Sequence, residues 1–222
     1  MLSRRRFIAG LTTGGSLLLA GCNAGPGGHE PPEGALLDHD GAPVPEELMR
    51  AGPLGERSYG RADAPVTVIE YASLTCPYCR RFHLATYPKF ERAYIDTGKV
   101  RYIIREFPIG RSAASAAIVT GCAPAKSYLR YYDALLVSQK QWTGQKVRPD
   151  AIYKAVAKLG MTRGAFDKCM TNQAIIDGLM WVKERGRKFG VAGTPTFFIN
   201  GKKVRGALTF DQMKALIEPQ IT

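Results

Sequence analysis

Two cysteines separated by two residues, in Cys76-Pro77-Tyr78-Cys79, are the side chains whose types and spacing most directly suggest chemistry in this sequence. Proline is favoured at the first position of a helix, where no N–H is needed, so Cys76 is predicted to cap a helix that begins at Pro77. The unpaired amides of Tyr78 and Cys79 and the positive end of the helix dipole then favour a thiolate at Cys76. Cys79 lies one turn further on, close enough to form a disulfide with Cys76.

A stabilised thiolate at Cys76 makes reduction of that disulfide more favourable, so the pair is predicted to oxidise other thiols. Arg80 and Arg81 add positive charge to the same turn, where they either act on the cysteine pair or are only solvated surface groups. The motif alone is weakly specific, because structural cysteine pairs and zinc sites use the same spacing.

A zinc site is the main alternative, since Cys76, Cys79 and His83 could supply three ligands. The fourth ligand is missing, because His29 and His39 are the only other histidines and both lie in a segment expected to be disordered. We therefore expect no bound metal and no other cofactor, with His83 as a surface or half-buried helix residue.

The cysteine pair is expected to lie between a buried strand and an amphipathic helix. Residues 65–71 are β-branched and almost continuously apolar, which is typical of a strand covered on both faces of an α/β sheet, and Glu70 is its polar exception. The amphipathic run after Cys79 extends to Gly98, and residues 100–107 are predicted to form a second strand of the same character.

Helices are expected to dominate the next part of the chain, and strands return near its end. Residues 112–189 have the helical period throughout, with predicted helix ends at Gly160 and near Gly190. The last elements are two short strands joined by a turn, and a closing helix: 196–199, a type I′ turn at Asn200-Gly201, 202–205 and 210–217.

A second motif, Gly193-Thr194-Pro195-Thr196-Phe197-Phe198-Ile199-Asn200-Gly201, adds to the cysteine pair. Strand, C-x-x-C, helix and this motif together resemble the thioredoxin superfamily. The resemblance implies a cis peptide bond before Pro195, packed beside the cysteine pair, for which an ordinary trans turn is the alternative. It also implies that the backbone of Thr194 binds extended substrate chain, with Pro77 and Tyr78 beside it.

The expected fold class is α/β, a thioredoxin-like fold over residues 57–222 with an inserted all-helical subdomain at about 112–189. Cys76 and Pro195 stand 119 positions apart, and this helical block makes up most of the excess over the spacing in plain thioredoxins. The insertion makes the sequence similar to the DsbA-like thiol:disulfide oxidoreductases, over roughly residues 59–217.

Glu70 matches the buried acid of that family, which is expected to take or relay the proton of Cys79. A salt-bridged core glutamate, paired with Arg105, is the alternative. Tyr78 stands where the best-known members carry histidine, so this turn lacks a cation. We therefore expect a less extreme oxidant than those members, with a pKa of Cys76 that is lowered but not to the family's lowest.

Cys122 and Cys169 lie in the helical block, at positions that resemble the second cysteine pair of some DsbA-like proteins. The resemblance implies a structural disulfide, which would contribute about 4 kcal/mol in the loop-entropy model. Two buried free thiols are the alternative.

Residues 1–21 are expected to be an export signal, because they hold three arginines, then a mildly apolar stretch, and no acid. Ser3-Arg4-Arg5-Arg6-Phe7-Ile8 resembles the twin-arginine motif. Leu19-Ala20-Gly21-Cys22 resembles a bacterial lipobox, which implies lipidation of Cys22; a plain secretory signal is the alternative. Either signal leads to the periplasm or the outer face of the cell membrane, where disulfides persist.

Residues 22–56 are expected to be a flexible tether. Gly and Pro supply 13 of the 32 positions from Ala24 to Gly55, with six acids against Arg50 alone.

Because the tether is acidic, the net charge of +12 is concentrated in the domain that follows it. Its basic residues are scattered without interleaved aromatics, so we do not expect nucleic-acid binding. With 222 residues, 45% of them hydrophobic, the chain is long enough to bury a core, which excludes the class of small disulfide-stapled miniproteins.

The sequence thus predicts an exported enzyme that introduces disulfides into unfolded or folding envelope proteins that carry thiols. The resemblance implies a membrane redox partner that reoxidises it. A reductase or isomerase, and a non-catalytic lipoprotein that binds unfolded chains, remain alternatives. The reduction potential of the Cys76–Cys79 pair distinguishes an oxidase from a reductase or isomerase. A Cys76→Ala variant that keeps its function would favour the non-catalytic lipoprotein.

Overall fold

The computed structural model describes residues 46–221, and every structural statement below concerns that part of the chain. The predicted signal at residues 1–21, the lipidation of Cys22 and most of the predicted tether lie outside the described residues. They stay predictions.

Five strands form one mixed sheet in the order β1-β3-β2-β4-β5. Their bounds are β1 Arg57–Tyr59, β2 Val66–Ala72, β3 Val100–Glu106, β4 Thr196–Ile199 and β5 Lys202–Arg205. β2 and β3 run parallel, and every other neighbouring pair runs antiparallel. The four longer strands lie where the sequence predicted them, and both residues of the predicted turn, Asn200 and Gly201, have the positive φ that a type I′ turn requires. β1 was not predicted, because three residues are too few to display a period.

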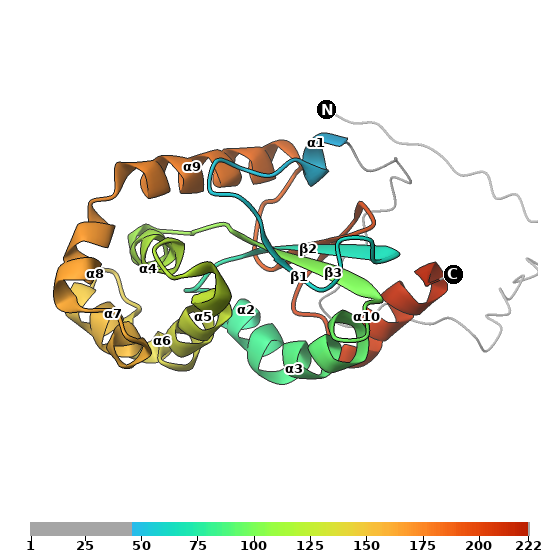
Figure 1. Cartoon of the computed structure of the whole chain (residues 1–222), viewed down its shortest axis with the longest axis horizontal. Coiled ribbons are helices and arrows are strands. Elements are labelled where there is room, and N and C mark those ends of the chain that lie inside the picture. The colour runs from blue at the N-terminus through green and yellow to red at the C-terminus, as the bar shows by residue number, and fades with distance from the viewer. Residues whose placement is uncertain (1–45, 222) are drawn as a thin grey trace, which may run out of the picture. The chain divides into compact units, whose positions relative to one another are not determined.

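The central strand β2 presents alternate residues to two separate cores. Val66, Val68 and Ala72 belong to one hydrophobic cluster, whereas Ile69 and Tyr71 belong to another. Figure 1 shows α2, α3 and α10 on one side of the sheet and α1 and α9 on the other. These helices are α1 Glu46–Met49, α2 Pro77–Arg81, α3 Tyr87–Phe90, α9 Gln173–Lys188 and α10 Phe210–Ile217. The π-helical segments Phe82–Thr86 and Glu91–Ile95 continue α2 and α3, so one helical run reaches from Pro77 to Ile95.

The predicted helical block contains six α-helices, of which five lie beyond the end of the sheet (Figure 1). The five are α4 Arg111–Gly121, α5 Tyr128–Val137, α6 Gln139–Trp142, α7 Pro149–Val156 and α8 Arg163–Met170. The sixth, α9, returns and packs against β3, so it belongs to the sheet's own covering layer as well as to the insertion. Gly160 and Gly190 take positive φ where helices end, as predicted.

The predicted tether ends earlier than residue 56. Residues 46–49 form α1, and Leu48 is only 1% exposed, in a cluster with Ile69 and Phe198. Glu56 pairs with Arg105 across 2.9 Å. The Gly and Pro content of this segment concealed the docking, because a single buried leucine produces no periodic pattern.

Candidate active site

Cys76 lies where the sequence placed it, directly before the first turn of α2. Its backbone is extended (φ −76°, ψ 121°), and Pro77 opens the helix. The pKa of Cys76 is lowered from 9.0 to about 6, chiefly by a hydrogen bond with the Cys79 thiol. The Thr194 side chain and the backbone amides of Cys79 and Tyr78 lower it further, while partial burial opposes them. The helix amides therefore contribute as expected, but the neighbouring thiol contributes more.

Cys79 has the opposite environment. Its side chain is fully buried, and burial raises its pKa well above 9.0, with the Cys76 hydrogen bond and the charge of Glu70 acting in the same direction. The amide of Ser73 donates to the Cys79 sulfur over 3.4 Å and opposes this rise. Both cysteines are free thiols in the structure. The pair therefore consists of one accessible sulfur that ionises easily and one buried sulfur that keeps its proton.

The Thr194–Pro195 peptide bond is cis, as predicted. The Thr194 carbonyl accepts a hydrogen bond from the Cys76 thiol over 3.1 Å, so the second motif does lie beside the cysteine pair. Pro77 and Tyr78, which follow Cys76 in the chain, are exposed, and Tyr78 is 56% exposed. Of the four residues predicted to bind substrate chain, Thr194 thus contacts the accessible sulfur, Pro195 follows it across the cis bond, and the other two are exposed beside Cys76 in sequence.

Glu70 is completely buried on the same face of β2 as Val68 and Ala72, whose hydrophobic cluster includes Cys79 of α2. Its Oε2 accepts a short hydrogen bond from the Tyr102 hydroxyl and lies 3.1 Å from His83 Nε2. The alternative pairing with Arg105 is wrong, because Arg105 points to the opposite face of the sheet, where its guanidinium binds Glu56 and the Tyr71 hydroxyl. Adjacent strand residues point to opposite faces, and Arg105 is in register with Tyr71 rather than Glu70.

His83 is the residue that sequence reasoning misjudged. It is 2% exposed, not a surface or half-buried residue, and its ring stacks on Tyr87. The spacing carried a signal, since a residue four positions after the buried Cys79 lies on the same helix face. Tyr102 was also missed, because nothing in the strand pattern distinguishes a tyrosine that binds Glu70 from one that only packs.

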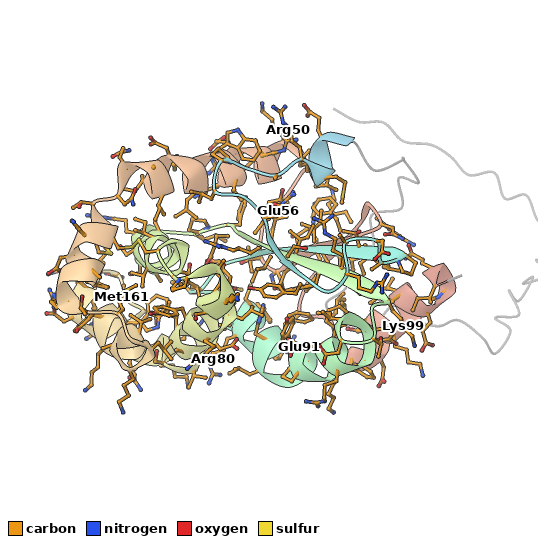
Figure 2. All side chains as sticks on the ribbon, in the orientation of Figure 1. Arg50, Glu56, Arg80, Glu91, Lys99 and Met161 are labelled. Atoms are coloured by element: carbon orange, nitrogen blue, oxygen red, sulfur yellow. A yellow bond between two sulfur atoms is a disulfide. The ribbon has the colours of Figure 1, made fainter. Side chains whose placement is uncertain are left out.

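Arg80 and Arg81 differ from each other. Arg80 Nε donates to the Leu136 carbonyl over 2.9 Å and so ties α2 to α5, near its label in Figure 2. The Arg81 guanidinium lies 5.2 Å from the centre of the Tyr78 ring. Neither arginine touches a cysteine sulfur through a hydrogen bond given by the structure, so both act outside the pair itself.

Cys122 and Cys169 form a disulfide with an S–S distance of 2.04 Å, the pairing that the resemblance implied. It connects the end of α4 to α8, within the helical block.

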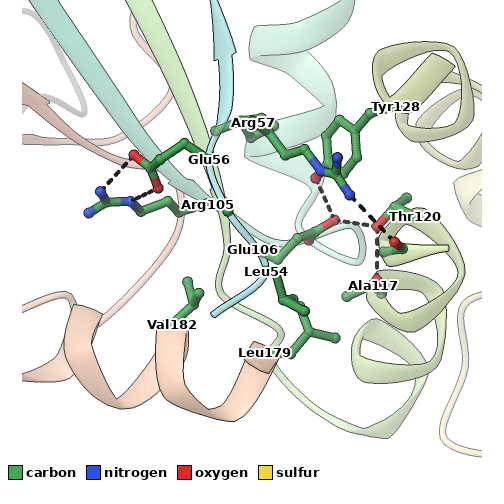
Figure 3. Close-up of a pocket in the computed structure, with 13 residues that line it drawn as sticks. Leu54, Glu56, Arg57, Arg105, Glu106, Ala117, Thr120, Tyr128, Leu179 and Val182 are labelled. Carbon is green, nitrogen blue, oxygen red and sulfur yellow. Dashed lines mark hydrogen bonds and ion pairs between the residues drawn. The ribbon is translucent and has the colours of Figure 1, made fainter. Parts of the chain in front are cut away.

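A second concave site, shown in Figure 3, lies between β3, α4, α5 and α9 and does not include the cysteines. Its cavity of about 40 Å³ has room for a few water molecules at most. Glu106 contributes a buried carboxylate whose Oε1 accepts hydrogen bonds from Thr120 and Tyr128. Burial raises the pKa of Glu106 from 4.5 to about 7.

Within residues 46–221 no three His, Cys, Asp or Glu side chains are grouped to hold a metal ion. In the same part of the chain, no helix has the length and apolar character needed to span a bilayer.

Comparison with known proteins gives one family match and several relatives. A family model described as thioredoxin matches residues 54–219. A Rickettsia bellii protein named as a protein-disulfide oxidoreductase is 30% identical over 146 residues, which cover 64% of this chain and 56% of that protein. The chain thus spans about half the length of the Rickettsia relatives that it matches. A Bacillus anthracis protein named for disulfide bond formation is 26% identical over 174 residues, covering 75% of this chain and 78% of the relative.

Solved structures show the same similarity in three dimensions. The crystal structure of alpha-DsbA1 from Wolbachia pipientis matches with a TM-score of 0.72 and 27% identity, covering 80% of this chain and 96% of that one. BdbD from Bacillus subtilis matches with a TM-score of 0.68 at 21% identity, covering 75% and 92% of the two chains, and supports the fold alone.

Proposed function

Because this chain belongs to the thioredoxin family, we propose that it is a thiol:disulfide oxidoreductase of the DsbA type that introduces disulfides into cell-envelope proteins. The observation that carries the proposal is the opposite pKa shift of the two thiols, lowered to about 6 at Cys76 and raised at Cys79. A reactive pair needs this asymmetry, because one sulfur must be an easily released thiolate and the other must be held in reserve.

The proposed reaction begins with Cys76 and Cys79 joined in a disulfide. A substrate thiolate attacks the accessible Cys76 sulfur, the Cys76–Cys79 bond breaks, and Cys79 leaves and takes up a proton. A second substrate thiolate then attacks the substrate sulfur of the mixed disulfide and releases Cys76 as a thiolate. The substrate has lost two electrons and gained a disulfide, and the enzyme is left as a dithiol.

The low pKa of Cys76 supports the oxidising direction. At neutral pH the reduced enzyme carries a stabilised Cys76 thiolate, and whatever stabilises the reduced form raises the reduction potential of its disulfide. Thr194, Pro195, Pro77 and Tyr78 are proposed to hold the substrate chain. The Thr194 carbonyl binds the Cys76 thiol, and Pro77 and Tyr78 are the exposed residues that follow Cys76.

We further propose that the protein acts in the periplasm or at the outer face of the cell membrane, because of the sequence of its first 22 residues. The twin-arginine and lipobox patterns support export and lipidation of Cys22. A membrane-bound disulfide protein is then the proposed oxidant of the reduced enzyme.

The reduction potential of the Cys76–Cys79 pair tests the direction, by equilibration with glutathione buffers. We expect a value well above that of thioredoxin, about −270 mV, and towards that of DsbA, about −120 mV. A value near −270 mV would overturn the oxidase proposal in favour of a reductase. In parallel, refolding of reduced, unfolded ribonuclease should be catalysed by the wild-type protein and not by Cys76→Ala. Full activity of Cys76→Ala would exclude thiol chemistry as the function.

A further inference from the structure

His83 occupies a position between a buried acid and a surface acid. Its Nε2 lies 3.1 Å from Glu70 Oε2, and its Nδ1 lies 3.9 Å from Oδ1 of Asp133. The side chains of Glu70 and His83 are completely buried, whereas that of Asp133 is 49% exposed. The three groups therefore form a series of neighbours from Glu70, which interacts electrostatically with Cys79, to the solvent-exposed carboxylate of Asp133.

Cys79 needs a route of this kind for its proton. It is fully buried and holds its proton tightly, yet it must release that proton whenever its sulfur attacks and take one up whenever its sulfur leaves. Water cannot reach a completely buried thiol directly. Glu70 interacts electrostatically with Cys79, and within residues 46–221 its Oε1 has no hydrogen-bond partner, but Glu70 is itself buried away from solvent.

We propose that His83 and Asp133 carry the proton of Cys79 between the buried carboxylate of Glu70 and solvent. The two ring nitrogens of a histidine can gain a proton on one side and release it on the other. His83 faces a different carboxylate with each nitrogen, and among the described residues its Nδ1 has no hydrogen-bond partner. The gap to Asp133 closes by a small rotation of a half-exposed carboxylate.

Of the acids among the described residues that face His83, Asp133 is the one that reaches solvent, because Glu70 and Glu106 are buried. The titratable groups that face His83 are Glu70 from β2, Tyr102 and Glu106 from β3, Tyr87 from the helical run, and Tyr132 and Asp133 from α5. Burial raises the pKa values of Tyr102 and Tyr132 far above neutrality, so these phenols do not lose protons.

The step rests on the proposed function and balances within it. During reoxidation, the Cys76 thiolate attacks a partner disulfide, forms a mixed disulfide and releases one partner thiolate. Cys79 passes its proton to Glu70, and the Cys79 thiolate attacks the Cys76 sulfur. The Cys76–Cys79 bond forms, the second partner thiolate leaves, and the proton moves through His83 and Asp133 to solvent.

The reduced full-length protein and dithiobis(nitrobenzoate) separate these two attacks in a stopped-flow experiment. The first thionitrobenzoate is released when Cys76 attacks, and the second when Cys79 closes the disulfide. We expect His83→Gln to slow the second release about tenfold at neutral pH, and Asp133→Asn to slow it by a smaller factor, with the first release unchanged. In His83→Gln the second rate should rise steadily into the alkaline range, because the proton must then be taken up by hydroxide that enters during transient opening of the site.

Two further variants give the comparison. Asp133→Glu should restore the wild-type second release. Glu91→Gln should leave both releases unchanged, because Glu91 is a neighbouring acid that binds the Tyr87 hydroxyl and not His83. A second release in Asp133→Asn and His83→Gln with the wild-type rate and pH profile would overturn the proposal. Loss of the first release in the wild-type protein would instead contradict the proposed function, since that release depends on Cys76 alone.

Discussion

Cys76 and Cys79 stand three positions apart in one helix, yet their surroundings shift their pKa values in opposite directions. The difference arises from depth, because Cys76 is partly accessible while Cys79 is covered by the core beneath α2. The buried thiol donates to the accessible sulfur and so favours the thiolate there. Each cysteine thus sets the state of the other, and the dithiol is best described as one unit.

The buried carboxyl group of Glu106 should make the free energy of unfolding depend on pH. Burial raises its pKa from 4.5 to about 7, so the folded protein binds this proton more tightly than the unfolded chain does. The protonated Glu106 therefore adds to the free energy of unfolding. This contribution of about 3 kcal/mol is fully present below pH 4.5 and is lost as the pH rises through 7. Glu106→Gln should remove this fall in the free energy of unfolding.

Urea unfolding of the oxidised protein between pH 4.5 and 8 measures this difference, because oxidation removes the titration of the cysteine pair. Glu184→Gln is the matched control, since Glu184 is about half exposed and pairs with Arg187 at the surface. An unchanged pH dependence in Glu106→Gln would show that another group causes the fall.

Among the elements, strand β2 positions both the buried acid Glu70 and the turn that carries Cys76. Its alternation directs Glu70 towards α2 and Tyr71 towards α9, and its carboxyl end leads into the turn that presents Cys76. On the α9 side the packing is so close that a Cβ at Gly186 would lie 2.8 Å from a ring carbon of Tyr71. Glycine at this position lets α9 approach the sheet.

Gly186→Ala should therefore lower the free energy of unfolding by about 1–3 kcal/mol, the usual cost of overpacking a core. The higher helix propensity of alanine opposes this loss by up to about 1 kcal/mol. Gly164→Ala in α8 is the control, because a Cβ there meets nothing within 4 Å, and it should be neutral or stabilising. Equal stability of the two variants by urea unfolding would contradict the described packing of α9.

The elements also show what the sequence could reveal. Strands over residues 65–71 and 196–199 were predictable because their apolar runs are continuous, and the Asn200-Gly201 turn because few residues accept its backbone. The burial of His83 and the partner of Arg105 were not, since both depend on which side of the sheet a neighbouring helix covers. Docking of Leu48 was hidden for a similar reason, because the residues that share its cluster lie on the distant strands β2, β3 and β4 and on α9.

At the scale of the whole molecule, the helical block and the sheet form a continuous core. Residues of α5 and α7 belong to the same hydrophobic cluster as those of β2 and β4, so the insertion and the thioredoxin-like part are not independent. The Cys122–Cys169 disulfide joins two helices of the insertion at a separation of 47 residues, away from the reactive pair.

Replacing Cys122 and Cys169 with serine should lower the free energy of unfolding by about 4 kcal/mol, because the unfolded chain regains the freedom of a closed loop. The reduction potential of the Cys76–Cys79 pair should stay the same. Urea unfolding and glutathione equilibration of this double variant measure the two quantities. A large change in potential with little change in stability would indicate a redox role for the second pair.

Cys76 should ionise far more easily than an ordinary cysteine, and the pH dependence of its alkylation by iodoacetamide in the reduced protein measures that ionisation. Cys79 does not interfere, since it is buried and protonated. We expect the alkylation rate to rise with a midpoint near pH 6. A midpoint near 8.5, the value of a free cysteine, would contradict it.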